Sequence, residues 1–161
     1  MRSKRRRILN AVIGRISAME KMAAVDVGRL LETLPRSREE RWELLKQFFS
    51  GWLGALRAAD GCRPDSIVAA EQRLGMALPV SLKEWYELAG LRESVWSCQD
   101  HFLIPEKLRV EGDRLIICVE NQSVVKWGIR VDEMHEDDPP VYVSDQEDEE
   151  NWIRETPSVN M

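Results

Sequence analysis

The sequence holds only three cysteines, Cys62, Cys98 and Cys118, and no C-x-x-C pair. An odd, scattered set of this kind does not form a disulfide framework, and it favours a reducing compartment. No apolar run approaches the roughly 20 residues that span a bilayer. The basic start of the chain does not resemble a signal peptide, because Arg15 interrupts its apolar run and no small-residue cleavage site follows. We therefore expect a cytoplasmic protein.

Residue patterns that carry catalysis or metal binding are also lacking. The histidines are His101 and His135, and the C-x-x-H pair of Cys98 and His101 has no second pair that would complete a zinc site. The sequence contains no P-loop, no G-x-G-x-x-G, no G-x-S-x-G, no zinc-deaminase motif and no EF-hand loop. We expect no enzymatic activity, no cofactor and no metal.

What the sequence does have is a strong gradient of charge. Residues 1–58 carry a net charge of +7 and residues 131–161 carry −10, within a chain whose total is −5. A basic head and an acidic tail favour electrostatic recognition of a partner. The two ends are equally able to attract each other within one fold.

The basic head predicts an N-terminal helical arm over residues 1–36. Its cations begin with the cluster Arg2, Lys4, Arg5, Arg6 and Arg7. An apolar stripe at helical spacing follows from Ile8 to Met19. Such a helix either binds nucleic acid or an anionic membrane, or it packs on its own domain or on a second copy, or simply frays. The second interpretation is favoured, since the ends of domains are commonly poorly ordered.

Three helices are predicted after the arm. Ser37 is placed to cap the first, whose apolar residues recur at three- and four-residue intervals. The other two lie between Ile67 and Gly90. Gly75 falls at a left-handed C-terminal cap of the earlier helix, and Ser81 with Glu84 forms a capping box at the start of the later one.

Beyond Gly90 the apolar period becomes that of strands. The candidate strands are residues 102–104, 108–110, 115–120, 125–131, 141–143 and 151–154. Gly128 interrupts the clearest alternation, and we expect it at a bulge or where another backbone approaches closely. Helices followed by an antiparallel meander predict an α+β fold with the helices packed on the sheet.

Several short motifs occur in a fixed order along the chain. They are Glu71, Arg73, Leu74, Gly75, Leu78 and Pro79; then Leu82, Trp85, Tyr86, Ala89 and Gly90, in a stretch that includes Ser81; then Glu120-Asn121-Gln122 and Trp127-Gly128; and finally Asp138-Pro139-Pro140-Val141. Together they resemble the SUKH superfamily, the Smi/Knr-type domain. The resemblance implies N-terminal helices on a curved, mostly antiparallel sheet over residues 37–161. Two departures are the lack of the family's usual C-terminal helix and the absence of a counterpart to residues 1–36.

The resemblance also implies a function. Bacterial members are similar to immunity proteins of polymorphic toxin systems, which bind a toxin domain, often a nuclease or deaminase, and block it without chemistry. We therefore expect a cognate toxin as the protein partner. The alternative is a regulatory scaffold of the Smi/Knr type with an unrelated partner.

Charge alone, and not the resemblance, selects the candidate surface for this partner. A negative surface complements the basic cleft that a nuclease presents to phosphates. The candidate residues are Asp132, Glu133, Glu136, Asp137, Asp138, Asp145, Glu147, Asp148, Glu149 and Glu150. A solvated negative face without a partner is the plainer interpretation of the same acids.

Overall fold

The computed structural model describes residues 37–96, 100–144 and 151–156 of the 161-residue chain. The chain divides into two units, residues 1–56 and 57–161. The boundary that the sequence predicts between arm and domain, after residue 36, falls inside the first unit. The predicted arm itself lies outside the described residues.

In the first unit the described element is the helix α3, Arg38–Leu53. The hydroxyl of Ser37 accepts a hydrogen bond from the Glu40 amide at 3.2 Å, which confirms the predicted N-cap. Within the predicted apolar stripe, the side chains of Trp42 and Phe49 are buried. Phe48 of the same stripe is 44% exposed, so the helical period predicted the buried side of α3 only in part.

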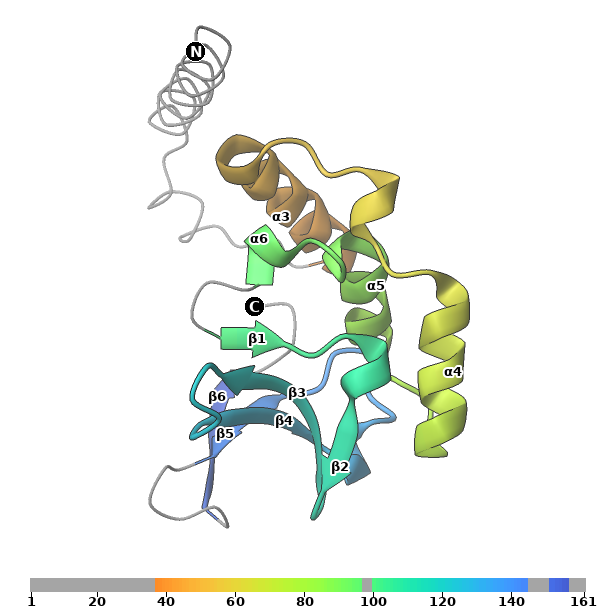
Figure 1. Cartoon of the computed structure of the whole chain (residues 1–161), viewed down its shortest axis with the longest axis vertical. Helices are drawn as coiled ribbons and strands as arrows, with labels where there is room; N and C mark the ends of the chain where they lie inside the picture. Colours follow the sequence, from red (N-terminus) through yellow and green to blue (C-terminus); the bar gives the residue numbers. More distant parts are fainter. Residues whose placement is uncertain (1–36, 97–99, 145–150, 157–161) are drawn as a thin grey trace, which may run out of the picture. The chain divides into compact units, whose positions relative to one another are not determined.

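In the second unit two helices stand side by side along one flank of the sheet (Figure 1). They are α4, Pro64–Leu74, and α5, Val80–Ala89. The fixed φ and missing amide of Pro64 suit the first position of a helix. Gly75 follows α4 with φ 70° and ψ 22°, and its amide donates to the carbonyl of Glu71. The predicted left-handed cap is therefore confirmed.

The predicted capping box at the start of α5 is wrong. Pro79 holds the N-cap position, and Ser81 lies inside the first turn. The Ser81 amide donates to the carbonyl of Asp137 at 2.9 Å, while its hydroxyl is buried with no hydrogen-bond partner among the described residues. A carbonyl from a distant segment thus satisfies an amide that would otherwise need a side-chain cap.

Six strands follow, and every pair of neighbours is antiparallel. They are β1, Asp100–Phe102; β2, Arg109–Glu111; β3, Arg114–Glu120; β4, Lys126–Arg130; β5, Val141–Ser144; and β6, Trp152–Thr156. Strands β3 to β6 form a meander, and β1 and β2 both pair with the other edge of β3. The predicted α+β class, with helices that precede the sheet, is confirmed.

Short helical segments make most of the remaining connections. They are η1, Ala58–Asp60; α6, Glu93–Trp96; η2, Pro105–Lys107; and η3, Val131–Glu133. None of them was predicted, because three- and four-residue helices carry too few residues for an apolar period. Figure 1 shows η2 next to α4, between β1 and β2.

One face of the sheet packs against α5. Leu82 and Tyr86 of α5 are fully buried in one core cluster with Leu115 and Ile129 of the sheet. The ring of Tyr86 lies edge-on to Phe102, with 6.1 Å between centroids. The predicted packing of the helices on the sheet is therefore confirmed.

Gly128 lies beside an irregularity in the sheet, as predicted. The register shifts between Ile116 and Cys118, the residues that pair with Gly128 and its neighbour. A Cβ at Gly128 would lie 3.1 Å from the Leu115 carbonyl oxygen and 3.4 Å from the Trp152 ring. The missing side chain leaves room for this ring, which is partly buried and packs against the core cluster.

Candidate functional site

Five of the ten predicted acidic residues lie on one connection between strands. We call residues 131–140, which join β4 to β5, the acidic connector. Its acids are Asp132, Glu133, Glu136, Asp137 and Asp138, and it contains no lysine or arginine. The other five candidates, Asp145, Glu147, Asp148, Glu149 and Glu150, lie outside the described residues.

Two of the connector's acids have partners on neighbouring strands. Arg130 donates through Nε to Asp132 at 2.9 Å and through Nη2 to its other oxygen, and this pairing raises the pKa of Arg130. The Tyr142 hydroxyl donates to Glu133 at 3.0 Å. Partial burial first, and then this hydrogen bond, raises the pKa of Tyr142. Asp132 and Glu133 therefore help to hold the connector on the sheet.

The backbone of the connector is fixed at both ends. The Val131 amide donates to the Asp113 carbonyl at 2.9 Å, and the Asp137 carbonyl accepts from Ser81 at 2.9 Å. Between these points the Met134 side chain is only 8% exposed. The connector therefore presents its outward carboxylates from a backbone whose position is set by the fold.

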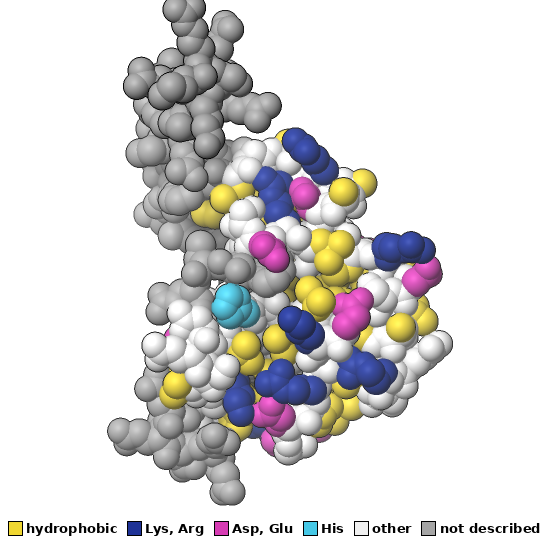
Figure 2. Space-filling view, in the orientation of Figure 1, with side chains coloured by type: hydrophobic (Ala, Val, Ile, Leu, Met, Phe, Trp, Pro, Cys, Tyr) yellow, Lys and Arg dark blue, Asp and Glu magenta, His cyan; other side chains and the backbone are white. Residues whose placement is uncertain are grey.

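The face of the molecule drawn in Figure 2 mixes the two signs of charge. Figure 2 shows cationic side chains in dark blue next to acidic ones in magenta over α4 and the sheet. Among the contacts, Arg63 pairs with Asp65 at 3.0 Å and Arg109 pairs with Glu111 at 2.7 Å. The acidic connector differs from these regions because acids are its only charged residues.

A second candidate site, which the sequence did not predict, lies on the face of the sheet that carries Gly128. We call it the Arg114 pocket. It has a volume of about 370 Å³ and is lined by Glu111, Gly112, Asp113, Arg114, Val124, Lys126, Ser144 and Trp152. The hairpin β2–β3 and the strands β4, β5 and β6 all contribute to it.

Arg114 is the central side chain of this pocket. It is only 9% exposed, and its guanidinium carbon lies 5.0 Å from the centroid of Tyr142 and 5.5 Å from that of Trp152. Its Nη1 pairs with the carboxylate of Asp113. Two aromatic rings and one carboxylate thus hold a nearly buried cation in place.

A second ion pair stands on the rim of the Arg114 pocket. Lys126 Nζ donates to Glu111 at 2.8 Å. Burial acts to raise the pKa of Glu111, but the hydrogen bonds from Lys126 and Arg109 outweigh it, and the pKa is lowered. Glu111 is therefore ionised at neutral pH and keeps Lys126 beside the pocket.

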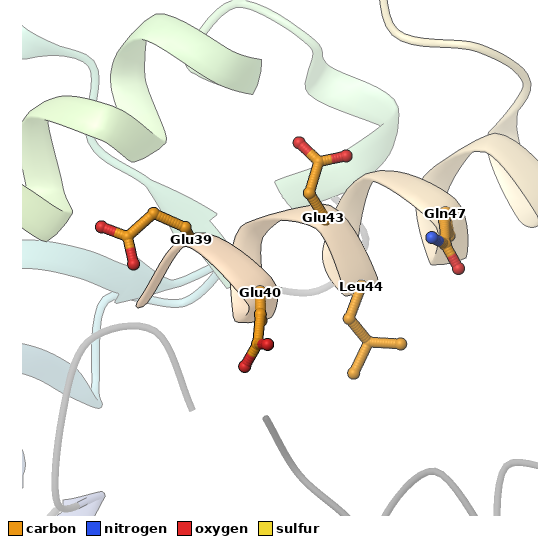
Figure 3. A pocket seen from close by; sticks show the side chains of 5 residues that line it. All are labelled: Glu39, Glu40, Glu43, Leu44 and Gln47. Atoms are coloured by element: carbon orange, nitrogen blue, oxygen red, sulfur yellow. The ribbon is translucent and has the colours of Figure 1, made fainter. Parts of the chain in front are cut away.

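A hollow on α3 is lined by one helix alone among the described residues. Its lining is Glu39, Glu40, Glu43, Leu44 and Gln47. In Figure 3 the carboxylate of Glu43 points away from Glu40 and Leu44, and Glu43 pairs with Lys46 at 2.6 Å. These polar groups do not converge on one point, so we assign no site to them.

Residues that carry the family resemblance mainly hold the fold. Glu71 accepts hydrogen bonds from the Leu78 amide at 2.8 Å and from Lys83 Nζ at 3.3 Å, which closes the turn between α4 and α5. Arg73 donates to the carbonyls of Pro105 and Leu108 at 2.9 and 2.8 Å. Neither contact was predicted, because each joins residues whose proximity depends on the fold.

The described cysteines are protected thiols. Burial raises the pKa of Cys62 to about 11 and that of Cys118 to about 12. Because the thiolate is the reactive form, both side chains are expected to resist alkylation. In a Cys98→Ser background, iodoacetamide at pH 8 should modify the native protein at least about tenfold more slowly than the urea-unfolded chain. Equal rates would show that these thiols are accessible and ionised.

The described residues offer no metal site and no membrane span. No group of three or more His, Cys, Asp or Glu side chains in the described ranges is placed to hold a metal ion. His135 contacts the Asp132 carbonyl at 2.8 Å through Nδ1, whereas Cys98 of the C-x-x-H pair lies outside the described residues. Among the helices described, none is long and apolar enough to cross a bilayer.

Comparison with known proteins returned no match. No protein-family model matches the chain, and no curated protein or solved structure matches it. The resemblance to the SUKH superfamily therefore rests on the motifs in the sequence.

Proposed function

We propose that this chain is a non-enzymatic protein-binding domain, and that it binds and neutralises a cognate bacterial toxin of the nuclease or deaminase type. The observation that carries the proposal is the acidic connector. The motifs that resemble the SUKH superfamily supply the kind of partner, and the connector supplies the surface that such a partner would recognise.

The geometry of the connector suits electrostatic capture of a basic domain. Asp132, Glu136 and Asp137 are exposed, while the backbone between them is held by Met134 and by the hydrogen bond to Ser81. A surface that is ordered before binding loses less conformational entropy in the complex. Clustered charge of one sign also accelerates the encounter with a partner of the opposite sign.

The first test is rescue. Co-expression with the toxin encoded beside it should restore growth, and the two proteins should purify as a stable complex. A complex that forms without rescue, or rescue without a complex, would contradict neutralisation by binding. Absence of both would favour the alternative, a regulatory scaffold of the Smi/Knr type.

The second test addresses the surface. The triple variant Asp132→Asn, Glu136→Gln and Asp137→Asn should bind the toxin with an association rate constant at least about fivefold lower at low salt, and with a weaker dependence on salt. Amide replacements keep the shape of each side chain. Circular dichroism should show that weakening the Arg130–Asp132 ion pair leaves the fold unchanged, so that the rate reports on charge.

A matched control carries the same change of charge on other elements of the second unit. In this control Asp65→Asn, Glu87→Gln and Glu106→Gln remove three exposed acids from α4, α5 and η2. The control should bind at a rate within about twofold of the wild type. If both triple variants lose the same fraction of the rate, net charge governs the encounter and the connector is not the binding surface.

A further inference from the structure

Two arginines that face each other across the sheet use their guanidinium groups differently. Arg114 of β3 pairs with Arg130 of β4 in the register of the sheet. Arg130 donates hydrogen bonds from Nε and Nη2, the two nitrogens on one edge of its guanidinium, to the two carboxylate oxygens of Asp132. Arg114 makes its described hydrogen bonds through Nη1 only, to Asp113, and its buried Nε has no hydrogen-bond partner among the described residues. One arginine thus holds a carboxylate on this edge, and the other does not.

The guanidinium of Arg114 has little freedom to turn elsewhere. The rings of Tyr142 and Trp152 lie 5.0 and 5.5 Å from its central carbon. Cation–π contacts with partly buried rings favour this position over one in solvent. Gly128 contributes to the arrangement, because a side chain there would approach both Arg114 and Trp152. The guanidinium is therefore held in place beside the pocket that Arg114 lines.

Other donors line the same cavity. Lys126 Nζ has one described partner, Glu111 at 2.8 Å, and three protons to donate. The Ser144 hydroxyl accepts from the Lys126 amide at 2.9 Å, which leaves its own proton for a further acceptor. A cavity of about 370 Å³ is large enough for a small organic group.

The balance of charge favours a single negative charge as the ligand. Among the described residues, the ion pairs around the pocket join three cations, Arg109, Arg114 and Lys126, to the two carboxylates of Glu111 and Asp113. One positive charge of this network is left over, although Arg109 does not itself line the pocket. A phosphate dianion would exceed this charge, whereas a carboxylate matches it. The planar fork of a guanidinium also fits the two oxygens of a carboxylate.

We propose that the Arg114 pocket binds a carboxylate group, which the Nε–Nη2 edge of Arg114 and the ammonium of Lys126 recognise. Val124 and Trp152 provide apolar surface for the carbon skeleton that carries the group. The carboxylate belongs either to a small planar acid or to the C-terminus of a peptide. No residue of the acidic connector lines this site, so the proposal does not depend on the proposed binding of a toxin.

The test uses the full chain and benzoate as the probe. Titration followed by NMR should shift the indole N–H signal of Trp152 saturably, with a dissociation constant on the order of 1 mM, as expected for a ligand of this size. Benzamide, which has the same shape and no charge, should produce no saturable shift. An equal effect of benzamide, or no saturation by benzoate at ten times that concentration, would overturn the proposal.

Variants locate the site. Arg114→Lys keeps the positive charge but removes the planar pair of N–H donors that binds both oxygens of a carboxylate. Benzoate should therefore bind this variant at least about tenfold more weakly. Arg130→Lys is the matched control, because its fork is already occupied by Asp132, and it should bind benzoate as the wild type does. Should Arg114→Lys fail to fold, Lys126→Gln takes its place, with an expected weakening of about threefold or more. Equal weakening in the control would place the ligand elsewhere.

A final pair of probes distinguishes the two sources of the carboxylate. N-acetylphenylalanine carries a carboxylate like that of a peptide C-terminus. The control compound N-acetylphenylalanine amide has the same skeleton but lacks that negative charge. Tighter binding of N-acetylphenylalanine than of benzoate indicates a peptide C-terminus, and the reverse order indicates a small planar acid. Equal binding of N-acetylphenylalanine and its amide would contradict recognition of a carboxylate.

Discussion

Gly61→Ala is expected to destabilise the protein by about 3 kcal/mol or more, although the backbone of Gly61 is of a kind that any residue adopts. Its φ is −89° and its ψ is 153°. A Cβ on this residue would lie 1.9 Å from the Glu87 carbonyl oxygen and 2.7 Å from the carbonyl carbon. Both atoms are backbone of α5, so the clash is relieved only if the chain moves away from the helix.

Neighbouring contacts oppose such a movement. The Cys62 amide donates to the Tyr86 carbonyl at 2.7 Å, and the Leu91 amide donates to the Asp60 carbonyl at 2.8 Å. Asp60 also pairs with Arg92 at 3.0 Å, and both side chains are largely buried. Moving Gly61 away from α5 strains these contacts on both sides of it.

The measurement is thermal unfolding followed by circular dichroism. For a chain of this size a loss of about 3 kcal/mol lowers Tm by roughly 10 °C. Gly75→Ala is the matched control, since Gly75 has φ +70° but open space around it. The left-handed backbone should cost that variant about 1 kcal/mol. A larger loss for Gly75→Ala than for Gly61→Ala would show that the contact between Gly61 and α5 adapts easily.

Gly61 also illustrates what the sequence was able to predict. Glycine and proline cluster within Asp60–Asp65, a pattern that predicts a turn. The segment does connect two helices, but the reason for glycine is the backbone of α5, 26 positions along the chain. Local composition predicts that a chain turns, whereas contact with a distant helix becomes visible only in the fold.

Ser81 and Arg114 differ from their expected roles for the same reason. Ser81 has the sequence of a helix cap, yet the Asp137 carbonyl satisfies its amide. Arg114 begins a strand and would be expected to point into solvent, yet Tyr142 and Trp152 cover it. In contrast, Gly75 is determined by its own helix, and that prediction was confirmed. Predictions held where the cause was local, and they failed where a distant segment supplied the partner.

The two aromatic residues of α5 are expected to contribute unequally to stability. The sequence predicts the same anchoring role for Trp85 and Tyr86. In the structure Tyr86 is fully buried, whereas Trp85 is half-buried and lies 5.5 Å from Phe102 between ring centroids. Tyr86→Ala should cost about 3–5 kcal/mol, and Trp85→Ala should cost less because its ring leaves a smaller cavity. Urea unfolding would measure both, and the reverse order would contradict the packing described.

The hydroxyl of Tyr86 permits a sharper experiment. It donates to the Leu103 carbonyl at 2.6 Å in a fully buried position. Tyr86→Phe keeps the ring but removes the hydroxyl, so the buried Leu103 carbonyl loses its hydrogen-bond donor. The free energy of unfolding should fall by about 1–2 kcal/mol at pH 8. An unchanged free energy of unfolding would show that the hydrogen bond contributes nothing net.

The pH dependence then separates the hydroxyl from the ring. Burial first, and then nearby negative charge, raises the pKa of Tyr86 well above its ordinary value. Above about pH 10 the unfolded chain releases this proton while the folded chain retains it, so the wild type loses stability as pH rises. Phenylalanine has no proton to release. The stability advantage of the wild type over Tyr86→Phe should therefore shrink between about pH 10 and pH 11, by up to about 1.4 kcal/mol per pH unit. An advantage that stays constant over this range would show that the hydroxyl titrates normally in the fold, and that it is not buried against Leu103.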